Sequence, residues 1–339
     1  MKPQILYLLI FFGLAFVIML VYKLISSNNV LHSKHKKQKT IIEDILKQLY
    51  HVEHSNRTAT VSDLAGALEI GRRNILPVVV EMTASRLIQA NDELLKLTNE
   101  GREYALKIIR VHRLWEKYLA EKTGHQQSDW HYLAEKMEHE LDEEEINMLS
   151  SSLGNPMFDP HGDPIPSAAG KVAKVKWVPL PSYPENKPAK IVHIEDEPGV
   201  IYQQILAKRI FVGSHIKIKN SDNKEITIIS EGQEHQFSPI IAANISVEPL
   251  NEDEVYEENA VRLSSLVKGE MAEVLGISKE CRGANRRRLL DLGILPGTQI
   301  EVDLSSPIRD PIAYRVRNTS IALRNSLADR ILINRININ

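Results

Sequence analysis

The chain contains one cysteine, Cys281, among 339 residues. A single thiol excludes an internal disulfide framework and a zinc site built from several cysteines, and it fits a reducing compartment. The chain also lacks an excess of charge of either sign, because 42 Lys and Arg residues are balanced by 44 Asp and Glu residues. Any basic surface for nucleic acid must therefore be local. Phosphate-binding loops and nucleophile motifs are missing as well, so we predict that the chain is not an enzyme.

Long apolar runs are absent except near the N-terminus, where residues 5–22 form a run of 18 residues. A helix of this length is about the shortest that crosses a bilayer core. The competing interpretation is a secretory signal peptide, but the run is longer than the apolar core of an ordinary one. Lysines follow the run at 23, 34, 36, 37 and 39, against Lys2 before it. This bias predicts a single-pass anchor in the inner (cytoplasmic) membrane, with the later domains in the cytoplasm. The basic residues 34–39 either contact anionic lipids or only end the membrane segment.

Histidines and carboxylates recur at helical spacing between residues 110 and 166. One stripe at i, i+4, i+7 and i+8 consists of His131, Glu135, Glu138 and His139, and a shorter stripe consists of His112 and Glu116. Two antiparallel helices with these stripes turned together would form a cage for a divalent cation. Imidazole and carboxylate without thiolate suit Mn²⁺ or Fe²⁺, although Zn²⁺ and Co²⁺ fit such sites too. The alternative is a solvated acidic helix face, since residues 140–145 add further carboxylates.

The segment before this stretch has the order of a winged helix. Apolar spacing predicts a helix from Thr40, a short helix over 60–70 capped by Ser62, and a further helix from Arg72 to Ala84. Strands 87–90 and 94–97 are predicted to form a hairpin, and Thr98 can cap a long helix over 99–122. Helix, helix-turn-helix and hairpin in this order are typical of winged-helix DNA-binding modules.

Residues 38–250 resemble the diphtheria-toxin-repressor (DtxR/MntR) family of iron- and manganese-dependent regulators. The motifs that carry the resemblance are Ile45-Leu-Lys-Gln-Leu-Tyr50, Val61-Ser-Asp-Leu-Ala65, Val111-His-Arg-Leu-Trp-Glu116, Glu135-x-x-Glu138-His139 and Asp159-Pro-His-Gly-Asp-Pro-Ile-Pro166. The resemblance implies a homodimer that binds DNA when it is loaded with Fe²⁺ or Mn²⁺.

The resemblance also implies two metal sites. The primary site would use Asp44, Glu135, Glu138 and His139, and the ancillary site would use His112, Glu116 and His131. Glu135 stands where iron-responsive members have a cysteine, which is closer to the manganese-responsive pattern. Lys47 stands where manganese-type members offer a carboxylate, and a cation there cannot ligate a metal. Asp44 would join the DNA-binding module to the metal helices, so that metal favours one arrangement of the two.

The predicted recognition helix departs from the family pattern on its outer face. Arg72, Arg73 and Asn74 open this helix and could contact phosphates or base edges. Its buried stripe is predicted to be Ile75, Val79 and Met82, which leaves Leu76, Pro77 and Val80 facing outward. An apolar outer face would equally suit a protein partner, such as a transporter subunit in the same membrane.

Two later segments look like copies of one another. The first copy has Leu206, Ile210, Gly213, Ile216 and Ile218, and the same pattern returns 84 residues later as Leu290, Ile294, Gly297, Ile300 and Val302. Alternating strands with glycine turns predict two small β-barrels. The proline-rich residues 167–188 and the acidic residues 251–259 are predicted linkers.

Each copy has its own family resemblance. The first resembles the SH3-like third domain of iron-responsive regulators, in which a Glu and a Gln are lent to the ancillary site. Pro198 and Ile201 fall at those positions, with Glu197 and Gln203 as nearby substitutes. The second resembles the FeoA family through Leu289–Thr298, Ser306–Pro311 and Ile321–Arg324, which implies iron biology and protein contact. A basic cluster of Arg282, Arg286, Arg287 and Arg288 either touches acidic partners or phosphate, or is a solvated helix face.

The sequence therefore predicts an α+β multidomain chain. The predicted parts are a transmembrane anchor (1–30), a winged helix-turn-helix (38–108), a helical metal-binding and dimerisation domain (109–170), an SH3-like barrel (187–251) and a FeoA-like SH3 barrel (262–338). The preferred function is a membrane-anchored, Fe²⁺- or Mn²⁺-dependent transcriptional repressor of metal homeostasis. The alternative is a cytoplasmic metal-sensing module of a membrane iron or manganese transporter, which docks protein rather than DNA.

Overall fold

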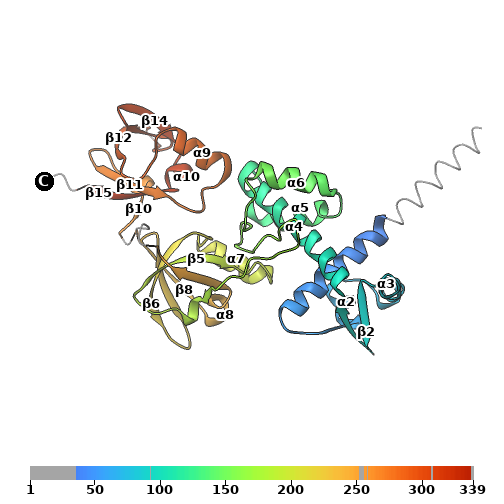
Figure 1. Cartoon of the computed structure of the whole chain (residues 1–339). Helices are drawn as coiled ribbons and strands as arrows, with labels where there is room; N and C mark the ends of the chain where they lie inside the picture. Colours follow the sequence, from blue (N-terminus) through green and yellow to red (C-terminus); the bar gives the residue numbers. More distant parts are fainter. Residues whose placement is uncertain (1–35, 92, 252–255, 258, 307, 337–339) are drawn as a thin grey trace, which may run out of the picture. The chain divides into compact units, whose positions relative to one another are not determined.

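The computed structural model describes residues 36–91, 93–251, 256–257, 259–306 and 308–336 (Figure 1). The fold is α+β, as predicted, and it divides into two compact units, one ending at Ile109 and the other beginning at Arg110. Within the described ranges, no helix is both long and apolar enough to cross a bilayer. The predicted anchor, residues 1–30, lies outside the described residues.

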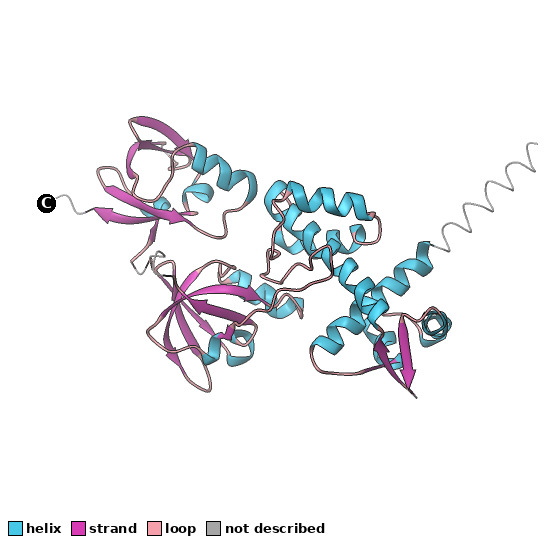
Figure 2. Ribbon diagram, viewed as in Figure 1, coloured by secondary structure: helices cyan, strands magenta, loops and turns pink. Residues whose placement is uncertain are grey.

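The first unit has the predicted winged-helix order. Residues 36–54 are helical, and they are followed by β1 (Ala59–Thr60), α2 (Val61–Ala67), α3 (Arg72–Ala84), β2 (Ile88–Asn91) and β3 (Leu94–Leu97). The strands form an antiparallel sheet in the order β1-β3-β2. Figure 2 distinguishes the helices and strands of the chain by colour. The core lies between the helices and this sheet, where side chains from every element are buried, among them Ile45, Leu64, Ile75, Met82 and Leu95. The predicted stripe of α3 is thus confirmed as its core face.

Helix α2 is capped by Thr60, so the predicted cap at Ser62 is wrong. The Thr60 hydroxyl accepts the backbone N–H of Asp63 at 3.2 Å, and the Asp63 carboxylate accepts the N–H of Thr60 at 2.8 Å. This reciprocal capping box satisfies two backbone donors that the helix leaves open. Ser62 has Ala65 three residues later and could not complete the same exchange.

Helix α4 (Asn99–Lys122) begins as predicted, because the Thr98 hydroxyl accepts the N–H of Gly101 at 3.0 Å. Gly101 also permits a close approach of two backbones. A Cβ atom at this position would lie 1.9 Å from the carbonyl oxygen of Leu87. The helix can therefore pack against the start of the hairpin only if residue 101 has no side chain.

The second unit contains helices followed by two six-stranded sheets. The helices are the rest of α4, α5 (Gln127–Met137) and α6 (Glu143–Ser152). The first sheet and its short helices comprise β4 (Val178–Pro179), η1 (Leu180–Ser182), β5 (Pro188–Ile194), α7 (Gly199–Ala207), β6 (His215–Ser221), β7 (Ile226–Ser230), β8 (Gln233–Phe237), α8 (Pro239–Ala242) and β9 (Ile245–Pro249). The second comprises β10 (Val261–Arg262), η2 (Leu263–Ser265), β11 (Met271–Ile277), α9 (Gly283–Asp291), β12 (Gln299–Ser305), β13 (Ile312–Val316), β14 (Thr319–Leu323), α10 (Asn325–Ala328) and β15 (Ile331–Ile336).

The two sheets have the same topology, which confirms the predicted internal duplication. Their strand orders, β4-β9-β5-β6-β7-β8 and β10-β15-β11-β12-β13-β14, correspond strand for strand. Even the irregularities recur: the register shifts after Ile218 in one copy and after Val302 in the other. Gly213 and Gly297 adopt positive φ angles of 88° and 81° at the equivalent turn. Each copy encloses its own apolar core.

The first predicted linker is partly wrong. Residues 178–182 belong to the first six-stranded domain, because β4 pairs with β9 and the Leu180 side chain of η1 is completely buried in the core of this domain. The prolines at 179, 181 and 184 suggested an irregular connection, yet β4 is an edge strand, where proline is tolerated. The second predicted linker, residues 251–259, lies mostly outside the described residues.

Replacing Gly101 tests the close approach of α4 to the hairpin. We expect Gly101→Ala to lower the free energy of unfolding of the winged helix by about 1–3 kcal/mol, because the added methyl group would overlap the Leu87 carbonyl. Gly66→Ala, inside α2 with open space around it, is the matched control and should be neutral or slightly stabilising. Urea denaturation of the two variants measures this, and equal stability of both would contradict the packing described.

Candidate metal centre

The carboxylate of Glu116 is the centre of a buried polar cluster. Glu116 lies on α4 and is only 1% exposed. Three imidazole nitrogens approach the same oxygen, Oε1: His112 Nε2 at 3.2 Å, His131 Nδ1 at 3.5 Å and His161 Nε2 at 3.7 Å. A buried carboxylate requires positive charge or hydrogen-bond donors, since unpaired burial costs several kcal/mol. The imidazoles supply this environment.

The cluster is assembled from separate parts of the second unit. Helix α4 presents His112 and Glu116 one turn apart, as the spacing predicted, and α5 presents His131. His161 comes from the loop of the Asp159–Pro166 motif, and Asp196 follows β5. The Asp196 carboxylate lies 3.6 Å from His131 Nδ1 and 3.9 Å from His161 Nε2.

The Asp159–Pro166 loop is shaped to deliver His161. Asp159 Oδ1 accepts the backbone N–H groups of His161 and Asp163 at 2.8 and 2.9 Å, which closes a tight turn. Gly162 has a φ of 98°, and a Cβ there would lie 2.0 Å from the carbonyl oxygen of Val192 on β5. Tyr202 on α7 binds His161 Nδ1 at 2.9 Å, which leaves Nε2 directed at Glu116.

His161 and Asp196 were missed as candidate ligands in the sequence. His161 stood inside a motif that was noted, but nothing in its spacing relates it to Glu116. The SH3-like copy was expected to contribute through Glu197 or Gln203. Glu197 Oε1 lies 3.9 Å from His131 Nε2, whereas Gln203 is exposed. Asp196, one residue before Glu197, lies closer to His131, at 3.6 Å. The SH3-like copy therefore contributes a carboxylate from a position just before Pro198 and Ile201.

The second group of predicted ligands lies at the end of α5. This helix ends at Met137, so the predicted continuous stripe is wrong beyond Glu135, and Glu138 is the C-cap. The buried Glu138 carboxylate contacts His112 Nδ1 at 2.5 Å and lies 3.7 Å from His139 Nε2. Glu135 is half exposed and lies 3.4 Å from His131 Nε2. Asp44 lies in the other unit, on the helix over 36–54, and its place in a primary site stays a prediction.

The alternative of a solvated acidic face fits α6 but not this cluster. Glu143, Glu144 and Glu145 are exposed at the start of α6, where Asp142 and Glu145 form a capping box. Acidic residues in the first turn favour a helix through its dipole, so these carboxylates have a structural role. Glu116 and Glu138 are buried instead.

The buried cluster favours a negative charge on Glu116 and positive charges on His131 and His161. Burial alone would raise the pKa of Glu116, but the charge of His112 and contacts with the other imidazoles hold it well below its ordinary value. The neighbouring carboxylates of Glu116 and Glu135 raise the pKa of His131 to about 10. Burial alone would lower the pKa of His161, but Glu116 and the other carboxylates raise it to about 9. Without metal, the negative charge of Glu116 therefore favours the protonated forms of His131 and His161.

The donor set fits a divalent cation. His131 Nδ1 and His161 Nε2 are buried, and neither has a hydrogen-bond partner among the described residues. Two combinations bring one ligand atom per residue within 4.8 Å of each other: His112, Glu116 and His131, and Glu116, His161 and Asp196. Nitrogen and oxygen donors without sulfur suit Mn²⁺ and Fe²⁺. A cation here would displace protons from these nitrogen atoms and neutralise the carboxylates.

The predicted DNA-contacting residues lie on the surface of the first unit. Arg72, Arg73 and Asn74 are exposed at the start of α3, and Arg72 lies 3.8 Å from Glu93 of the hairpin. Leu76 and Val80 face outward as predicted, with exposures of 42% and 68%. The outer face of α3 therefore combines a polar first turn with an apolar middle.

Comparison with known proteins identifies two domains. Residues 98–167 match the family described as iron dependent repressor, metal binding and dimerisation domain, and residues 261–335 match the FeoA domain. Residues 98–167 are thus similar to the iron-dependent repressors, and residues 261–335 are similar to FeoA domains. The predicted resemblances to the diphtheria-toxin-repressor family and to the FeoA family are confirmed.

Individual relatives extend this assignment. The iron-dependent repressor IdeR of Mycobacterium leprae is 27% identical over 211 residues, which cover 58% of this chain and 91% of the relative. A probable metal transport system membrane protein of Chlamydia trachomatis is 38% identical over 85 residues, 25% of this chain and 19% of that protein. A solved manganese-dependent transcriptional repressor in complex with manganese shares the fold, with a TM-score of 0.55 and 23% identity over 61% of this chain and 99% of its own.

The raised imidazole pKa values predict the pH dependence of the metal-free protein. Because the pKa of His161 is about 9 in the folded state and roughly 6.5 when unfolded, its stabilising effect is complete below about pH 6.5 and lost as pH rises through 9. We expect the free energy of unfolding to fall between about pH 7 and pH 9. Urea titrations at several pH values measure this. A His161→Gln variant should show a flatter profile, and an identical slope in both proteins would contradict the assignment.

Proposed function

We propose that this protein is a transcriptional regulator controlled by Fe²⁺ or Mn²⁺, which binds DNA as a metal-loaded dimer. The observation that carries the proposal is the buried cluster around Glu116, in which His131 Nδ1 and His161 Nε2 lack hydrogen-bond partners among the described residues. The winged-helix order of the first unit and the IdeR relative support the DNA-binding part.

In this proposal the cation binds to Glu116, His161 and Asp196, with His112 and His131 beside it. A second cation site would combine Asp44, Glu135, Glu138 and His139, as the family resemblance implies. Metal bound there would tie the winged helix to the metal-binding domain and favour the DNA-binding arrangement. We also propose that the chain has the five parts predicted from its sequence. Residues 5–22 would anchor it in the membrane, with the regulatory domains on the cytoplasmic side.

A second candidate is a metal-sensing module of a membrane metal transporter. The exposed Leu76 and Val80 on α3 favour it, since polar side chains normally contact the major groove from this face. The similarity to a chlamydial metal transport membrane protein points in the same direction. In this case α3 would dock against protein, and metal would control that contact.

Metal-dependent stabilisation tests the site. At a Mn²⁺ concentration of about 100 times Kd, the native protein should gain about 2.7 kcal/mol of stability. Glu116→Gln and His161→Ala should lose most of this gain, because each removes a ligand of the proposed cation. His139→Ala and Glu138→Ala test the second site in the same way. Thermal unfolding with and without Mn²⁺ measures the gain.

Glu144→Gln is the matched control, because it removes an exposed carboxylate of α6 outside the cluster. It should keep the full gain. If Glu116→Gln and His161→Ala gain as much melting temperature with Mn²⁺ as the control does, the cluster is not the metal site.

A gel shift separates the two candidate functions. For a regulator, residues 39–339 should shift duplex DNA with Mn²⁺ or Fe²⁺ and not with chelator, and Arg73→Ala should weaken the shift. Leu76→Ser and Val80→Ser should leave it intact. Binding that does not respond to metal, or that only follows salt concentration, would favour the protein-docking alternative.

A further inference from the structure

The cations of the two six-stranded domains differ in their partners. Several arginines form ion pairs: Arg209 binds Glu280 and Asp329, Arg262 binds Glu231, and Arg315 binds Glu301. Four other cations lie close together in the sequence, Lys279, Arg282, Arg286 and Arg287. Throughout the described ranges, no carboxylate comes within 4.0 Å of their charged nitrogens.

These four cations line one cleft of about 540 Å³. Its walls come from the end of α4, the residues 159–160, the residues 212–213 and the start of the FeoA-like copy. Lys122 of α4 adds a further positive charge, and Lys117 also lines the cleft. The two carboxylates at the wall are already engaged, since Glu121 pairs with Lys117 at 3.1 Å and Asp159 accepts backbone N–H groups. The cleft therefore retains a marked excess of positive charge.

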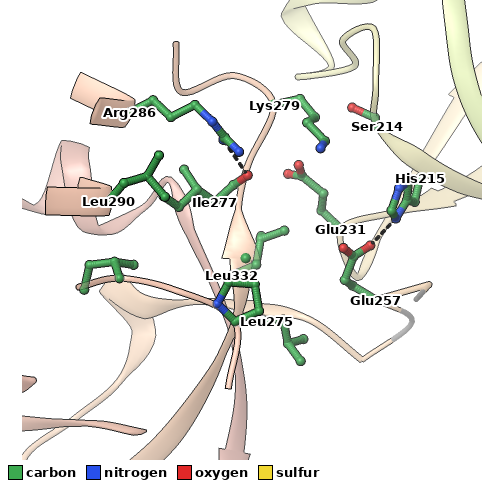
Figure 3. Close-up of a pocket in the computed structure, with 13 residues that line it drawn as sticks. Ser214, His215, Glu231, Glu257, Leu275, Ile277, Lys279, Arg286, Leu290 and Leu332 are labelled. Carbon is green, nitrogen blue, oxygen red and sulfur yellow. Dashed lines mark hydrogen bonds and ion pairs between the residues drawn. The ribbon is translucent and has the colours of Figure 1, made fainter. Parts of the chain in front are cut away.

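The contacts that hold Arg282 and Arg286 in place are with neutral groups. Arg282 Nε donates to the Lys279 carbonyl at 3.3 Å, and its guanidinium lies 5.6 Å from the centre of the Trp130 ring. Arg286 donates to the Ile277 carbonyl at 3.2 Å, as Figure 3 shows from the neighbouring cavity, in which Lys279 is also seen. Burial lowers the pKa of both Arg282 and Lys279. Partly buried cations without an anion are costly unless a ligand supplies one.

We propose that this cleft binds a phosphorylated small molecule, with Arg282, Arg286 and Arg287 contacting its phosphate groups. The planar guanidinium fork matches phosphate oxygens and pairs with them through two hydrogen bonds. The volume falls in the range of small-ligand sites, which is roughly 300–1,000 Å³. Val212 and Leu290 also line the cleft and can contact an organic part of the ligand. Because several segments form its walls, the cleft suits a compact ligand better than a nucleic-acid duplex.

Isothermal titration of the full chain in non-ionic detergent tests the proposal. The probes are inorganic phosphate, pyrophosphate and ADP, added to metal-free protein so that chelation does not contribute heat. We expect saturable binding of pyrophosphate or ADP. Arg282→Gln and Arg286→Gln should each weaken it at least about tenfold, because each removes a charge-assisted contact. Tighter binding of ADP than of pyrophosphate would indicate contacts to the organic part, and equal binding would indicate the phosphate groups alone.

Arg288→Gln is the matched control, because Arg288 is exposed on the same helix, does not line the cleft and carries the same charge. It should change the affinity less than about twofold. Arg287→Gln, at an exposed residue of the cleft, covers the case in which the Arg282 variant folds poorly. Failure of all three probes to bind, or an equal loss with Arg288→Gln, would overturn the proposal. Binding of duplex DNA through Arg282 without binding of these probes would also overturn it.

Discussion

The buried negative charge of Glu116 is the constraint on which the second unit depends. A carboxylate that is 1% exposed must be compensated, and here three imidazoles converge on one of its oxygen atoms. Those imidazoles come from α4, α5 and the Asp159–Pro166 loop, and Asp196 closes the cluster from the SH3-like copy. Protons can satisfy this arrangement, and so can a divalent cation. Exchange between the two links metal binding to pH and to the packing of these segments.

The same loop connects the cluster with the basic cleft. Asp159 holds the turn that directs His161 toward Glu116, and it also lines the cleft beside Arg282. Tyr202, which binds His161, belongs to the SH3-like copy. The candidate metal centre therefore combines residues of α4 and α5 with residues of the first six-stranded domain, while the FeoA-like copy contributes the cations of the neighbouring cleft. The two copies share one topology but have different polar surfaces.

Local signals in the sequence predicted most of the fold. The hairpin, α3, α4 with its Thr98 cap and the two copies of one sheet topology follow from apolar spacing, turn residues and the repeat of 84 residues. The site was predictable only in part. His112 and Glu116 were found because they lie one turn apart on a single helix. His161 reaches Glu116 through a loop in which Gly162 packs against Val192, and Asp196 joins the cluster through His131 and His161. Spacing along the chain carries no information on such contacts, and the end of α5 at Met137 was likewise not visible in the pattern.

Anomalous diffraction from crystals of the manganese-loaded protein tests the central claim most directly. The account predicts an anomalous peak bonded to a carboxylate oxygen of Glu116 and to Nε2 of His161, with Asp196 as a further ligand. A manganese ion bound only elsewhere, with Glu116 still enclosed by its imidazoles alone, would contradict it.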